Sequence, residues 1–123
     1  MNIRKSREIN LMITLYYIFR PLQLKIQEDL GGKAELRMAK AKAGPVVTDN
    51  GNLLLDWTFD LTELKQKLSI DIDKDLWQAV NTKLLSMAGV VDTGLFVEMA
   101  KIAYFGDANG EVTKLVDNPN YFS

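Results

Sequence analysis

The chain has 123 residues, 47% hydrophobic and 25% charged, which is enough for one domain with a buried core. Its 15 lysines and arginines against 16 aspartates and glutamates leave a formal net charge of -1, so no general affinity for nucleic acid or anionic membranes is predicted. There is no cysteine and no histidine, which excludes disulfide bonds, thiolate nucleophiles, imidazole bases and the commonest zinc and copper ligands.

The first apolar segment, Ile9–Phe19, comes after three basic residues, Arg4, Lys5 and Arg7. This order imitates a secretory signal peptide, but the segment ends in Arg20-Pro21-Leu22-Gln23 and no small-residue cleavage site follows. Its eleven residues are also too few to span a bilayer as a helix. We therefore expect a buried strand or helix of the fold here rather than a targeting segment.

The residues that follow have the pattern of a short amphipathic helix. Pro21 suits the first helical position, and Leu22, Ile26 and Leu30 follow at intervals of four residues on one face. Gly31-Gly32 stands where a left-handed C-terminal cap is common. The helix is therefore predicted to extend from the proline to the glycine pair.

Two strands and a turn are predicted over the next part of the sequence. Charged and apolar side chains alternate over residues 33–39, which is typical of a strand with one face on a core. Asn50-Gly51 lies between two β-prone runs, 44–48 and 53–59, and predicts a hairpin turn with positive φ at both central residues. Large apolar residues alternate in the second run, which favours a central strand.

Two helices are predicted further along. Asp60 and Glu63 have the spacing of a capping box, and the apolar stripe behind them predicts a short helix over residues 61–68. A polar run, 69–75, then precedes a stripe of period 3.6 from Leu76 to Met87, which predicts the second main helix.

The remaining elements are predicted to be strands. Val90–Phe96 is expected to form a short buried strand. Ile102–Phe105 and Val112–Leu115 flank a turn-rich loop, Gly106–Gly110, and predict a C-terminal hairpin.

With Ile9–Phe19 as a leading strand, the elements follow the order β-α-β-β-α-β. This order predicts an α/β (α+β) fold of the ferredoxin-like, split βαβ type, with helices on one face of an antiparallel sheet and a C-terminal hairpin in addition. No repeat, low-complexity tract or Pro-rich linker is present, so a second independent domain is not predicted.

Two oxygen-rich stretches resemble cation sites. Thr48–Asn52 can offer Asp and Asn oxygens, but a Ca²⁺ loop needs further carboxylates at alternate positions, and three leucines follow instead. We favour a turn. Asp71, Asp73 and Asp75 alternate like metal ligands, but an acidic run before a helix is better explained by the positive N-terminal end of the helix dipole.

A basic patch that can attract a phosphate group is made by Lys33, Arg37, Lys40 and Lys42. A solvated strand face explains these side chains equally well. Trp57 and Trp77 lie on apolar stripes, so we expect core packing rather than stacking on a ligand. The residues alone indicate no nucleophile with a base, no acid and base pair, and no phosphate-binding glycine loop.

Two long stretches match a family pattern in order: Ala34–Ala39, Lys42–Asn52 and Leu55–Trp57, followed by Gly89–Phe96, Met99-Ala100 and Tyr104–Gly106. They resemble the C-terminal half of ribose-5-phosphate isomerase, type A, in its eukaryotic-type form. The resemblance extends over residues 21–116.

The resemblance implies a two-lobed cytoplasmic enzyme of the non-oxidative pentose phosphate pathway that interconverts ribose 5-phosphate and ribulose 5-phosphate, without metal or organic cofactor. In that family a carboxylate base and a lysine of the N-terminal, doubly wound lobe move a proton between C1 and C2 of the phosphosugar. This sequence has no counterpart of the family's Asp-Gly-Ala-Asp-Glu, Lys-Gly-Gly-Gly or Gly-Thr-Gly-Ser-Thr segments. We therefore predict no catalytic, cofactor-binding or metal-binding residue, and an inactive protein when it is alone.

The resemblance also divides the sequence. Residues 1–20 do not match and can supply a substitute strand; residues 21–99 correspond to the small ferredoxin-like lobe, with an insertion expected at 61–76. Residues 100–123 correspond to strands that return to the large lobe. The family habit implies a homo-oligomer or association with full-length subunits.

Two other functions stay open. One is that of a non-enzymatic oligomerisation or interaction module, because a terminal hairpin without the large lobe exposes its edges. The other is that of a redeployed ligand-binding domain, for which the basic patch is the motivation. Copurification with an intact isomerase subunit would support the first alternative. Absence of phosphosugar binding would remove the support for the second.

Overall fold

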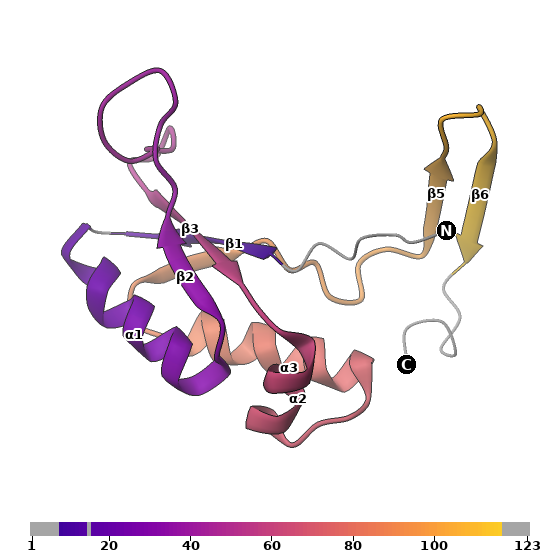
Figure 1. The fold of residues 1–123 in the computed structure, drawn as a ribbon, viewed down its shortest axis with the longest axis horizontal. Coiled ribbons are helices and arrows are strands. Elements are labelled where there is room, and N and C mark those ends of the chain that lie inside the picture. The colour runs from indigo at the N-terminus through magenta and orange to yellow at the C-terminus, as the bar shows by residue number, and fades with distance from the viewer. Residues whose placement is uncertain (1–7, 15, 117–123) are drawn as a thin grey trace.

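The computed structural model describes residues 8–14 and 16–116. The four-stranded antiparallel sheet has the order β2-β3-β1-β4, and a two-stranded hairpin, β5–β6, stands apart from it (Figure 1). The helices gather on one side of the larger sheet. In sequence order the elements are β1 (Glu8–Ile13), η1 (Tyr16–Ile18), α1 (Phe19–Leu30), β2 (Lys33–Leu36), β3 (Leu53–Thr58), α2 (Leu61–Leu68), α3 (Asp73–Ser86), β4 (Val90–Thr93), β5 (Ile102–Gly106) and β6 (Val112–Val116).

The topology is the split βαβ arrangement. α1 connects β1 to β2, and β3 lies between these two strands; α2 and α3 connect β3 to β4, and β1 lies between those. The predicted α+β fold, with an antiparallel sheet and helices on one face, is therefore confirmed. In the described part of the protein, no helix is long and apolar enough to cross a membrane.

The core fills the space between one face of the sheet and the helices. Side chains alternate along the two central strands, so that one set is buried and the other faces outward. The register places Leu11 opposite Leu55 and Ile9 opposite Trp57. The helices contribute the buried residues Leu22, Ile26, Leu30, Leu64, Leu76, Val80 and Leu84.

Both tryptophans serve this core. The indole Nε1 of buried Trp57 donates a hydrogen bond of 3.0 Å to the carbonyl oxygen of Gly31. The ring centroids of Trp57 and Phe59 are 5.0 Å apart, and those of Phe59 and Trp77 are 5.4 Å apart. These spacings are typical of packed aromatic pairs, so the three rings join β3 to α3.

Two boundaries near the N-terminus differ from the sequence prediction. The leading strand β1 ends at Ile13 instead of continuing to Phe19, and α1 begins at Phe19, ahead of Pro21. Pro21 is tolerated inside the first turn because the first four amide groups of a helix have no intrahelical acceptor. The proline therefore did not mark the first helical residue.

The strand predicted over residues 33–39 is also shorter, since β2 ends at Leu36. Beyond it the backbone folds back, and the amide of Val46 donates to the carbonyl oxygen of Arg37 at 2.9 Å. The run 44–48 consequently makes only isolated bridges and is not a strand. β3 pairs with β2 on this side and with β1 on the other, so it is a central strand, as predicted.

The hairpin turn is centred one residue earlier than predicted. Gly51 N donates to Thr48 O at 2.9 Å, so Asp49 and Asn50 are the central residues, and neither has a positive φ. This is a type I turn followed by a glycine with φ of 79°. Thr48 N donates to Asn52 O at 2.8 Å and closes the loop. The prediction of two positive φ values was therefore wrong.

The helix α2 has the predicted bounds. The side chain of Asp60 accepts a hydrogen bond of 3.0 Å from Glu63 N, as a capping residue does. Lys67, in the last turn of α2, connects this helix to α1: its Nζ donates a hydrogen bond of 3.1 Å to the carbonyl oxygen of Glu28. The following helix, α3, begins at Asp73, inside the run predicted to precede it.

The strand predicted over Val90–Phe96 is neither as long nor as buried as expected. β4 ends at Thr93 and lies at an edge of the sheet, where Val91 is exposed. Phe96 lies outside the strand and is 71% exposed. An apolar run alone does not distinguish an edge strand from a buried one, because it shows neither how many strands pair with it nor whether both faces of the sheet are covered.

Replacing a buried side chain of α1 tests the location of the core. Ile26 is fully buried, so Ile26→Ala is expected to lower the free energy of unfolding by about 2 to 5 kcal/mol. Leu24, on the same helix, is 60% exposed, and Leu24→Ala is expected to change it by less than about 0.5 kcal/mol. Urea unfolding measures both, and equal losses would contradict this placement of the helix.

Candidate functional site

The basic patch is divided by the structure into paired and solvated cations. Arg37 forms a bidentate ion pair with Asp56 of β3: Nε lies 3.0 Å from Oδ2, and a terminal nitrogen lies 2.6 Å from Oδ1. The hydrogen bond to Asp56 raises the pKa of Arg37 above its ordinary value. Lys33 Nζ lies 2.8 Å from an oxygen of Glu35. Two of the four cations of the patch are therefore neutralised by carboxylates.

The other two cations of the patch, Lys40 and Lys42, are exposed on the loop between β2 and β3. Figure 1 shows this loop projecting beyond the end of the sheet. An exposed lysine is a mobile, strongly hydrated charge, and a specific phosphate site normally adds backbone amides or a rigid guanidinium fork. The guanidinium of Arg37 is already engaged by Asp56. The patch thus has the geometry of a solvated surface.

The described side chains of the two oxygen-rich stretches, which do not include that of Asp73, form no metal site either. In the Thr48–Asn52 turn, Oγ1 of Thr48 accepts a hydrogen bond of 3.0 Å from Asn52 N. Asp71 is exposed, and Asp75 lies in the first turn of α3. Among the described side chains of residues 8–14, 17–72 and 75–116, no three Asp or Glu are placed to hold a metal ion together.

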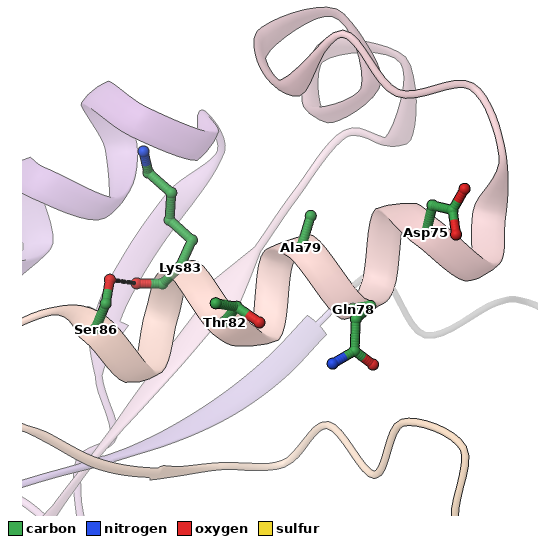
Figure 2. Close-up of a pocket in the computed structure, with 6 residues that line it drawn as sticks. All are labelled: Asp75, Gln78, Ala79, Thr82, Lys83 and Ser86. Atoms are coloured by element: carbon green, nitrogen blue, oxygen red, sulfur yellow. Dashed lines mark hydrogen bonds between the residues drawn. The ribbon is translucent and has the colours of Figure 1, made fainter.

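The surface of α3 carries a shallow hollow of about 510 Å³. The six residues that line it, shown in Figure 2, are Asp75, Gln78, Ala79, Thr82, Lys83 and Ser86. They all come from this one helix, and Gln78 and Lys83 extend in different directions. Side chains that diverge from one helix do not enclose a substrate, because an enclosed site needs walls from several elements.

One of these side chains belongs to a charge cluster that the sequence pattern did not indicate. Asp29 of α1 has a solvent-shielded Oδ2, which lies 3.0 Å from Nζ of Lys25 and 3.7 Å from Nζ of Lys83. The close ion pair with Lys25 lowers the pKa of Asp29 below its usual value, and the charge of Lys83 adds to this. The i, i+4 spacing of Lys25 and Asp29 can be read from the sequence as an ion pair within one helix. The approach of Lys83 from α3 depends on the tertiary structure.

The geometry therefore defines a ferredoxin-like α+β fold without an enclosed cleft in its described residues. Comparison with known proteins identifies the family of this lobe. Residues 13–110 match the profile of ribose 5-phosphate isomerase A, also called phosphoriboisomerase A. The chain belongs to this family.

Relatives and solved structures agree with this assignment. The chain is 45% identical to the human ribose-5-phosphate isomerase over 101 residues, which are 82% of this sequence and 28% of that protein. It is also 45% identical to ribose-5-phosphate isomerase A of Synechococcus over 87 residues, 71% of this sequence and 32% of that protein. The chain thus spans less than a third of the length of these relatives.

A solved D-ribose-5-phosphate isomerase in complex with phospho-erythronic acid superposes with a TM-score of 0.72 and 27% identity, over 93% of this chain and 43% of that one. The isomerase of Methanocaldococcus jannaschii shares the fold, with a TM-score of 0.70 and 23% identity, over 94% of this chain and 44% of that one. The predicted resemblance to the family is confirmed.

Acid unfolding tests the Asp29 cluster. Since the native pKa of Asp29 is depressed, its carboxylate stabilises the fold above the unfolded-state pKa of about 4, and this contribution is lost as the pH falls through the native pKa. Asp29→Asn is expected to remove that part of the pH dependence. Urea unfolding at a series of pH values measures it.

The matched control for this experiment is Glu28→Gln, which removes an exposed carboxylate from the same turn of α1. Its stability is expected to follow the parent protein down to acidic pH. If both variants lose the same part of the pH dependence of stability, Asp29 has no special role in acid unfolding.

Proposed function

We propose that this chain is the small lobe of a ribose-5-phosphate isomerase and that it serves the interconversion of ribose 5-phosphate and ribulose 5-phosphate without supplying catalytic groups. Family membership is the observation that carries the proposal. Aldose-ketose isomerisation moves a proton between two neighbouring carbons, which needs a base within hydrogen-bonding distance of the substrate. In the described residues, the carboxylates of Asp29, Glu35 and Asp56 are paired with lysine or arginine side chains, and that of Asp60 caps α2.

The hairpin supports a place for this lobe beside a larger one. Its two strands have apolar side chains on both faces: Tyr104 and Val112 project from one face, and Phe105 and Leu115 from the other. Strands that are apolar on both faces are usual where helices cover both sides of a sheet. A doubly wound lobe offers such a sheet.

The division of the sequence is part of the same proposal. In it, residues 1–20 form a separate N-terminal segment that supplies a substitute strand, and the family profile begins within this segment, at residue 13. Residues 21–99 form the small lobe with an insertion at 61–76, and residues 100–123 the strands that return to the large lobe. Residues 1–7, 15 and 117–123 lie outside the described part of the protein. A cytoplasmic location and a homo-oligomeric state, or association with full-length subunits, are proposed on the basis of the family.

A second function, as an interaction module, is favoured by the exposure of the hairpin. Ile102, Tyr104, Val112 and Val116 are all exposed apolar side chains. A two-stranded hairpin is marginally stable by itself in water, so a partner that covers it gains apolar contact and stabilises it. In this case the protein would bind an intact isomerase subunit or a second copy of itself through β5–β6.

Isomerase assays test the first proposal. The purified 123-residue protein, shown to be folded by circular dichroism, is expected to give no turnover of ribose 5-phosphate above the buffer blank. A full-length isomerase assayed beside it is the positive control. Turnover by the 123 residues alone would mean that they form an active site themselves, and would contradict the non-catalytic role.

Binding measurements test the second function. Replacing Tyr104 and Phe105 together by Asp places charges on both faces of the hairpin, and is expected to weaken association with an intact subunit by about tenfold or more. Leu24→Asp changes an exposed apolar side chain of α1 and serves as the matched control. Sedimentation of mixtures measures the complex. Equal binding by the parent protein and both variants would exclude the hairpin as the contact surface.

A further inference from the structure

The two Asn-Gly pairs of the sequence occupy equivalent turns. Asn50-Gly51 follows Thr48-Asp49, and Asn109-Gly110 follows Asp107-Ala108 at the tip of the β5–β6 hairpin. In both turns the glycine amide donates to a carbonyl oxygen three residues earlier, at 2.9 Å for Gly51 and 3.2 Å for Gly110. Both glycines have a left-handed φ, 79° and 81° respectively.

These pairs are arranged for an intramolecular reaction of asparagine. Both asparagines and both glycines are exposed to water. A Cβ added to either glycine would meet no atom within 4 Å, so the space beside each glycine is open. Glycine also lacks the side chain that hinders attack by its nitrogen on the preceding residue. Asparagine is among the thermolabile residues of proteins for this reason.

We propose that Asn50 and Asn109 are sites of spontaneous deamidation, and that Asn109 reacts first. The backbone nitrogen of the glycine loses its proton to solvent base and bonds to Cγ of the asparagine. Nδ2 takes a proton from water as its bond to Cγ breaks, and it leaves as ammonia. Water then opens the resulting succinimide at either carbonyl. The products are aspartate and isoaspartate, and no oxidant or reductant is needed.

The order of reaction follows from how firmly each turn is held. The ring closes only when the glycine amide leaves its hydrogen bond and the turn opens. The Asn50 turn is held by β3, a central strand, and by Asn52, whose amide nitrogen Nδ2 lies 3.3 Å from Sδ of Met12 in β1. Opening this turn therefore disturbs the larger sheet.

The Asn109 turn has no such attachment among the described residues. Its backbone amides are held by Asp107, whose Oδ1 accepts hydrogen bonds from Asn109 N and Glu111 N at 2.9 Å each. These hydrogen bonds lie within the hairpin and open together with it. β5 and β6 contact chiefly each other, and an isolated two-stranded hairpin is marginally stable. The open form of this turn is consequently populated more often.

Isoaspartate at position 109 also changes the hairpin. The backbone then passes through the former Cβ and Cγ atoms of the asparagine, which lengthens the turn by one atom and adds a negative charge beside Asp107 and Glu111. Because the register of a hairpin is set by its turn, the pairing of β5 with β6 is disturbed. The reaction thus damages the surface that is exposed for docking.

The experiment follows both sites in the folded 123-residue protein, kept in mildly alkaline buffer and sampled over time. Peptide mass spectrometry counts amide loss at each site, and methylation by an isoaspartyl methyltransferase counts isoaspartate. Asn109 is expected to react on the order of tenfold faster than Asn50, the ratio that corresponds to about 1.4 kcal/mol in barrier height. Asn10 and Asn81, which precede leucine and threonine, are expected to stay intact.

Two variants and one condition complete the test. Asn50→Gln and Asn109→Gln are each expected to abolish the signal at their own site and leave the other unchanged, because glutamine would have to close a larger ring. In urea the turns no longer exist, and the two rates are expected to become equal. A folded protein in which neither site reacts while both react in urea, or in which Asn50 reacts as fast as Asn109, overturns the proposal.

Discussion

The packing of Trp57 against the end of α1 is the contact on which the rest of the structure depends. Its indole N–H satisfies the carbonyl of Gly31, and its ring lies against Phe59, which in turn contacts Trp77 of α3. A Cβ at Gly32 would lie 2.9 Å from the indole nitrogen and closer still to the Thr58 carbonyl. One aromatic residue therefore holds the α1–β2 connection, the central strand and the second main helix in register.

The same packing fills the space between the sheet and the helices in the described residues. The inner face of the sheet is filled by apolar side chains and covered by helices, so no polar cleft remains there. The ion pair of Arg37 with Asp56 joins the chain beyond β2 to β3. The β5–β6 hairpin lies outside this packing, and its apolar side chains and the two Asn-Gly turns are exposed to solvent.

Local signals predicted elements well where one residue type has one structural consequence. The Asp60 cap defined α2, because a carboxylate oxygen bonded to an amide three residues later is a local interaction. Asn50-Gly51 correctly indicated a turn but not its centre, since Asn-Gly suits both a turn with two positive φ values and a type I turn followed by glycine. The edge position of β4 left no sequence signal, because strand order depends on residues far away in the sequence.

The sequence by itself determined the fold class, the family, and the absence of cysteine and histidine chemistry. Periodicity, motifs and composition depend only on the order and identity of the residues. Only the tertiary structure decided that half of the basic patch is neutralised, that Asp29 binds a lysine from each of two helices, and that one Asn-Gly turn is anchored while the other is not. The physical reason is distance: each of these outcomes depends on strand register or helix docking, which joins residues that local pattern cannot connect.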